Sequence, residues 1–188
     1  MYTFIVTQLA VGFGAFALPF YVLYGKNELH MPTEQVGILV GAQMAGGIAS
    51  NLLCAHLSDH VGNRIVIILT AVTMSLLPLL ALLSAGVGWT LLVVVFVLIG
   101  FSVNAGAIGF TNYLLEIAPE QLRPTYIALR GTLMGLTMFL PILGGLLIDA
   151  ASYQAMFLVT LAVSIIGILL SLKPVRNAVA DSKGGDGA

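Results

Sequence analysis

The stretch that decides the fold is IVIILTAVTMSLLPLLALLS, residues 65–84, which contains no charged side chain. A helix rises ~1.5 Å per residue and the hydrocarbon of a bilayer is ~30 Å thick, so ~20 apolar residues can span it. Stretches of similar length and character lie on both sides of this one. The six predicted spans are residues 2–24, 34–55, 65–84, 89–116, 125–148 and 153–172.

The composition agrees with a chain immersed in lipid. Hydrophobic residues make up 59% of the 188 residues and charged residues only 8%, whereas soluble domains carry roughly 25% charged residues. A soluble fold of this size has too little interior to hide so much apolar surface. The net charge of -1 argues against a nucleic-acid partner. The single cysteine, Cys54, excludes an intrachain disulfide and is expected to pack as a small side chain.

The spans are expected to be helices. Backbone polar groups in lipid must be hydrogen-bonded within the protein, and a barrel would show shorter, alternating segments. Residues 1–172 are therefore predicted to form an all-α polytopic membrane bundle of six transmembrane helices. Pro19, Pro78 and Pro141 lie inside spans and are expected to kink them. The N-terminus lacks the basic residues of a signal peptide, and residues 173–188 are expected to be a disordered cytoplasmic tail.

Lys and Arg predict the orientation of the spans, because short cytoplasmic segments are enriched in them. Of the seven such residues, Lys26 alone falls in an odd-numbered break. The others lie in even-numbered breaks, at the start of the fifth span or in the tail: Arg64, Arg123, Arg130, Lys173, Arg176 and Lys183. Both termini are therefore expected in the cytoplasm, with the plasma (inner) membrane as the location.

The break between the second and third spans reads AHLSDHVGNR, residues 55–64. It resembles the signature G-x-L-x-D-x-x-G-R-R/K of the major facilitator superfamily, and the matching residues are Leu57, Asp59, Gly62 and Arg64. Ala55 and Asn63 depart from the signature. Glycine permits a tight turn, the aspartate is expected at a helix start, and the arginine can pair with a carboxylate. A generic turn with one orienting arginine is the alternative.

Two further segments resemble the same family. NYLLEIAPEQLRP, residues 112–124, resembles the loop between the fourth and fifth helices of a half, and PILGGLLID, residues 141–149, resembles the P-x-x-G-G-x-L-x-D end of the fifth helix. The three partial matches occur in the family order and cover nearly the whole chain. The chain therefore resembles one six-helix half, built from two three-helix repeats.

The departures from the signature indicate which half this is. First halves of the family usually have a complete signature loop and often an arginine in the fourth helix. Here the loop is degenerate, and residues 100–106 contain no basic side chain. Both features favour the C-terminal half, whereas the P-x-x-G-G element slightly favours the first.

Polar side chains within spans should face a cavity or another helix, because exposing them to lipid is costly. Gln43, Gly47 and Asn51 share one helix face, and Asn104 and Thr111 share another. The resemblance implies that the first, second, fourth and fifth helices line the substrate cavity. The substrate-binding candidates are Gln8, Gln43, Asn104 and Thr111. Hydrogen bonds between helices, worth ~0.6 kcal/mol on average, are the alternative.

The resemblance also implies a conformational switch at the cytoplasmic ends of the helices, formed by Asp59, Gly62, Arg64, Glu116 and Arg123. Arg64 is expected to approach Glu116. Arg130 is expected to snorkel to the cytoplasmic interface rather than to bind substrate. The pairs Gly37–Gly41 and Gly131–Gly135 have the spacing that allows close helix packing.

Other chemistry is not indicated. No acidic residue lies in the middle of a span, so no proton relay is predicted, and His30, His56 and His60 are expected in loops without a metal site. We expect no enzyme activity, no cofactor and no metal. If the cavity lacks charge, a neutral or amphipathic substrate fits better than a strongly charged one.

The resemblance implies secondary transport of a small solute, with substrate bound near the midplane between two rocking halves. The expected partners are membrane lipid, the small-molecule substrate and the missing other half or a second copy. The chain is expected to be a fragment or a half that must pair. The alternatives are a self-pairing half-size transporter, or a non-transport membrane sensor or assembly protein on the same scaffold.

Overall fold

The computed structural model describes residues 2–172, so the predicted disordered tail lies outside the described residues. The elements are α1 (Tyr2–Phe13), η1 (Gly14–Ala17), α2 (Phe20–Asn27), η2 (Thr33–Gln35), α3 (Val36–His60), α4 (Asn63–Val87), α5 (Leu91–Ile117), η3 (Glu120–Leu122), α6 (Arg123–Thr137), α7 (Leu140–Ala150) and α8 (Tyr153–Leu172). The prediction of an all-α membrane bundle is confirmed.

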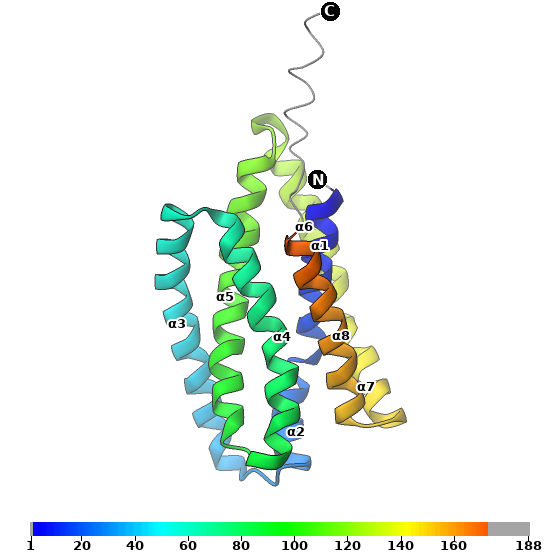
Figure 1. The fold of residues 1–188 in the computed structure, drawn as a ribbon. Coiled ribbons are helices and arrows are strands. Elements are labelled where there is room, and N and C mark those ends of the chain that lie inside the picture. The colour runs from blue at the N-terminus through cyan, green and yellow to red at the C-terminus, as the bar shows by residue number, and fades with distance from the viewer. Residues whose placement is uncertain (1, 173–188) are drawn as a thin grey trace, which may run out of the picture.

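Within the described residues, four helical segments are long and apolar enough to cross a membrane: Thr33–His60, Asn63–Val87, Leu91–Ile117 and Glu120–Ala150. A shorter apolar helix, α8, follows these segments, and the interrupted run from α1 through η1 to α2 precedes them. In Figure 1 the chain runs up and down the bundle, and α1 begins at the end of the bundle where α8 finishes. This arrangement matches the six predicted spans.

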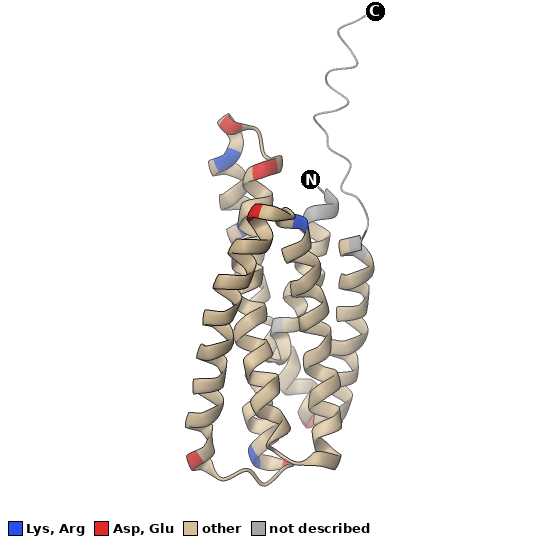
Figure 2. Cartoon of the chain, turned by 60° about the vertical axis from the view of Figure 1, so that its left-hand side comes forward, with Lys and Arg blue, Asp and Glu red and all other residues tan. Residues whose placement is uncertain are grey.

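The charged residues gather at the two ends of the bundle, and the ribbon between these ends is almost entirely uncharged (Figure 2). This separation follows from the cost of placing charge in hydrocarbon. The turns between α3 and α4 and between α5 and α6 lie at the end where α1 begins. The breaks expected on one side of the membrane are therefore together in space.

The prolines affect the helices in two ways. Pro19 precedes α2 and Pro141 lies in the first turn of α7, so both stand next to a break in a span. Pro78 lies inside α4, which continues without interruption from Asn63 to Val87. A proline at the start of a helix lacks an N–H group that would have no helical partner there, whereas an internal one removes a bond.

The end of α3 differs from the sequence prediction. The helix continues to His60, so His56 and His60 lie on α3 rather than in a loop, with ring centroids 4.2 Å apart. Asp59 is exposed in the last turn of α3 and not at a helix start, so its predicted capping role is wrong. The reason is that no residue before Gly62, with a φ of 109°, requires the helix to stop.

The closest helix contact joins α3 and α5. A Cβ atom at Gly46 would overlap the carbonyl group of Val97, and one at Gly100 would overlap the carbonyl oxygen of Gln43. Glycine is therefore required for the two backbones to touch. The predicted pairs Gly37–Gly41 and Gly131–Gly135 do not mediate packing here, because nothing lies within 4 Å of a Cβ built at any of these positions.

A second group of contacts closes the bundle around α8. Tyr21 and Tyr24 of α2 are fully buried and pack against Phe157 of α8, with ring centroids 5.1 Å away in both cases. Asn27 donates a hydrogen bond to the hydroxyl of Tyr153 at 2.9 Å. No such cover lies over one face of α3 and α5 in the described residues, where Met44, Ile48 and Val103 are exposed.

Candidate functional site

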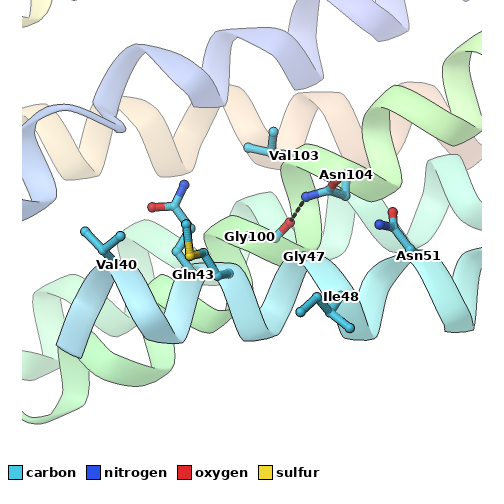
Figure 3. A pocket seen from close by; sticks show the side chains of 9 residues that line it. Val40, Gln43, Gly47, Ile48, Asn51, Gly100, Val103 and Asn104 are labelled. Atoms are coloured by element: carbon cyan, nitrogen blue, oxygen red, sulfur yellow. Dashed lines mark hydrogen bonds between the residues drawn. The ribbon is translucent and has the colours of Figure 1, made fainter. Parts of the chain in front are cut away.

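A groove with mostly apolar walls and three amide side chains lies along the uncovered face of α3 and α5. Its volume is about 520 Å³, and its lining residues are Val40, Gln43, Met44, Gly47, Ile48, Asn51, Gly100, Val103 and Asn104. Figure 3 shows Gln43 and Asn51 rising from α3 and Asn104 from α5. The side chains of Met44 and Ile48 are 66% and 65% exposed, so no other element of the described chain covers the groove.

The positions of the three amides follow from helix geometry. Gln43 and Asn51 are eight residues apart on α3, so they lie on one face with Gly47 between them. The glycine makes room for the α5 amide, because a Cβ at Gly47 would stand 2.7 Å from Nδ2 of Asn104. The shared face predicted for Gln43, Gly47 and Asn51 is thus part of one groove.

Asn104 is held in a defined orientation. Its Nδ2 donates a hydrogen bond to the carbonyl oxygen of Gly100 at 2.9 Å (Figure 3). The side-chain oxygen is then left as an acceptor. With Gln43 and Asn51, the groove offers both donors and acceptors among apolar walls. Such a surface can bind the hydroxyl or carbonyl groups of a small polar solute.

The other two substrate-binding candidates lie elsewhere. Gln8 is only 5% exposed in α1 and is not among the residues that line the groove. Thr111 is seven residues beyond Asn104 on α5, which places it on the same face about 10 Å further along. The structure therefore brings Gln43 and Asn104 together and leaves Gln8 apart from them.

Thr111 contacts the guanidinium of Arg130, a residue expected at the cytoplasmic interface. Nη1 of Arg130, on α6, donates a hydrogen bond to the hydroxyl oxygen of Thr111 at 2.7 Å. The Nε atom of Arg130 is buried without a hydrogen-bond partner among the described residues. The guanidinium of Arg130 thus has a polar partner on α5, and its expected position at the cytoplasmic interface stays a prediction.

The predicted switch residues lie around the turn between α3 and α4. Nδ2 of Asn63 donates a hydrogen bond to Oε2 of Glu116 at 3.2 Å, and Ser58 donates one to Oδ1 of Asn63. Arg64 and Glu116 both lie close enough to Tyr113 for their charges to act on its hydroxyl. The predicted approach of Arg64 to Glu116 stays a prediction, and Asn63 is one residue that contacts that carboxylate.

Arg123 makes a local ion pair. Its Nη1 atom is 3.6 Å from Oε1 of Glu120, three residues earlier, and both side chains are substantially exposed. Exposed pairs of this kind contribute little to stability. The ion pair with Glu120 therefore does not explain the predicted role of Arg123 in a conformational switch.

Three residues of these sites were not proposed from the sequence. Asn51 was recognised as sharing a face with Gln43 but was not selected, although its spacing pointed to the groove. Asn63 departs from the family signature, which has a basic residue there, and the signature does not indicate that its amide donates a hydrogen bond to Glu116. Ser58 lies five residues before Asn63, and no sequence pattern distinguishes it from other serines near a predicted loop.

Comparison with known proteins agrees with these features. The sequence profile of the Major Facilitator Superfamily matches residues 3–187. The chain is also 28% identical over 135 residues to solute carrier family 2, facilitated glucose transporter member 12, from Macaca fascicularis and from Homo sapiens. The aligned region covers 69% of this chain and 21% and 22% of these relatives, so the chain spans about a fifth of their length.

Proposed function

Because the chain belongs to the major facilitator superfamily, we propose that it forms one half, the C-terminal one, of a transporter that moves a small polar solute across a membrane. The observation that carries this proposal is the amide-lined groove of Gln43, Asn51 and Asn104 on an uncovered face. A groove open on one side becomes a solute cavity when a second body covers it.

The chemistry of the groove supports a hydroxylated solute. Its lining residues contain three amides and no titratable side chain, and amides form hydrogen bonds with hydroxyl groups both as donors and as acceptors. The curated relatives are named as facilitated glucose transporters. We therefore propose a sugar-like solute of about hexose size as the substrate class.

The partner that covers the groove is proposed to be the missing other half of the transporter. Polar side chains facing hydrocarbon without partners are unfavourable by several kcal/mol each. The amides of the groove therefore need a protein surface or a water-filled cavity in front of them. A second copy of this chain is the alternative cover, which would make the protein a self-pairing half-size transporter.

The orientation is also a proposal. We infer that the end with the α3–α4 and α5–α6 turns faces the cytoplasm of a plasma (inner) membrane, from the excess of Lys and Arg there.

Uptake by a whole transporter that contains this half, reconstituted in liposomes, tests the proposal. Asn104→Ala and Gln43→Ala are expected to raise the KM for the solute roughly tenfold each, because a hydrogen bond to the solute is lost. Thr132→Val is the control, since the hydroxyl of Thr132 is exposed on α6 and donates a hydrogen bond to the carbonyl oxygen of Ala128. Unchanged uptake in both groove variants would show that the groove does not bind the solute.

A further inference from the structure

Arg130 is a cation within a membrane span. It lies on α6, inside the candidate span Glu120–Ala150, and its side chain is half-buried. Its contact within residues 2–172 is the hydrogen bond to Thr111, and its Nε atom is buried without a partner there. The ion pair found near the start of α6 belongs to Arg123 and Glu120 instead.

A half-buried guanidinium in this position is stabilised by an anion. Arginine keeps its charge in proteins, and a buried charge without a counter-ion is strongly unfavourable. The hydroxyl of Thr111 is neutral, and it already donates its proton to the carbonyl oxygen of Ala107 at 2.6 Å. The described residues therefore orient the guanidinium but do not neutralise it. Charged residues within spans usually face a cavity and mark the path of a substrate.

The guanidinium belongs to the same face as the amide groove. Thr111 and Asn104 are separated by seven residues of one helix, which is about two turns, so their side chains point in nearly the same direction. Ala107, between them, is exposed. Arg130 thus stands beyond one end of the groove, on the side of the α5–α6 turn, with an uncovered helix face between the two.

We propose that the solute carries one carboxylate, which Arg130 binds while Asn51 and Asn104 hold the hydroxylated remainder. This inference rests on the proposed function and narrows its substrate class from a neutral sugar to a sugar acid or similar hydroxy acid. Thr111, which holds the guanidinium, is about 10 Å along α5 from Asn104, a separation that a hexose-sized acid can bridge when it forms a hydrogen bond at each end. Thr111 acts as the positioning residue that aims the guanidinium.

The test compares glucose with glucuronate, which differ in a single carboxylate. Both are supplied to the whole transporter in liposomes, and binding and uptake are measured. The wild-type protein is expected to prefer glucuronate. Arg130→Gln is expected to weaken glucuronate binding roughly tenfold or more, because hydrogen bonds to a charged group are the stronger ones, and to change glucose binding less than twofold. Arg130→Lys should recover part of the loss.

Two further variants test whether Thr111 orients Arg130 and whether the effect depends only on net charge. Thr111→Val should weaken glucuronate binding less than Arg130→Gln does, because the charge stays but its orientation is lost. Lys26→Gln removes an exposed cation from the last turn of α2 and should alter neither solute. Loss of binding in Lys26→Gln would indicate a general effect of net charge and would contradict the assignment to Arg130.

The outcomes separate this inference from the proposed function. If glucose is bound through Gln43 and Asn104 but Arg130→Gln has no selective effect on glucuronate, the proposed function stands and the anion site is wrong. The same holds if a carboxylate of the other half is found paired with Arg130 in the solute-bound state. If neither solute binds the wild-type protein, both proposals are wrong.

Discussion

Asn63, the first residue of α4, donates a hydrogen bond to the carboxylate of Glu116 near the end of α5, across 3.2 Å. The family signature has a basic residue at the position of Asn63. An uncharged amide therefore takes part in the link between the α3–α4 turn and the end of α5. A neutral donor makes a weaker contact with a carboxylate than a cation does.

Asn63→Lys tests the strength of this link. The lysine is expected to pair with Glu116 and to favour the conformation described here by about 1 kcal/mol at most, because the contact is exposed. Stability is measured by unfolding in detergent, and the conformational balance by the accessibility of a cysteine placed in the groove. The double variant Asn63→Lys, Glu116→Gln is the control, and an equal effect in this variant would show that Glu116 is not the partner.

Gly100→Ala tests the contact between α3 and α5. The added methyl group would overlap the carbonyl oxygen of Gln43, so we expect a loss of roughly 1–3 kcal/mol in the free energy of unfolding. Gly41→Ala is the matched control, because its Cβ would have nothing within 4 Å. The control should be neutral or slightly stabilising, since alanine favours helix more than glycine does. Equal destabilisation by both variants would contradict the assigned crossing point.

Reporter fusions test the orientation. A reporter placed after Lys26 is expected to give the external signal, and one placed after Lys173 the cytoplasmic signal, because the excess of Lys and Arg favours the cytoplasmic side. An external signal from the fusion after Lys173 would reverse the proposed topology.

The chain alone is expected not to transport. Its groove is lined by the exposed residues Met44 and Ile48 of α3, and alternating access requires a second body that encloses the solute. Purified chain in liposomes should therefore show no saturable uptake of glucose or glucuronate. Uptake by a crosslinked dimer would favour the self-pairing alternative, and uptake by a demonstrated monomer would contradict the half-transporter proposal.

The sequence by itself determined the number and approximate limits of the spans. Length and hydropathy suffice for this, because a helix must match the thickness of the hydrocarbon whatever its neighbours are. Helix periodicity likewise placed Gln43, Gly47 and Asn51 on one face, since residues four apart on a helix always share one. The limits of α3 were less well predicted, because the helix continues through polar residues to His60.

Only the tertiary structure decided which faces meet. Gly46 and Gly100 are at the helix crossing and Gly37 and Gly41 are not, although all four are glycines within spans. Gln8 is buried while Gln43 lies in the groove, and Arg130 reaches Thr111 on another helix. These contacts depend on the position and rotation of each helix relative to the others. Packing of many side chains sets those quantities jointly, so no local pattern in the sequence encodes them.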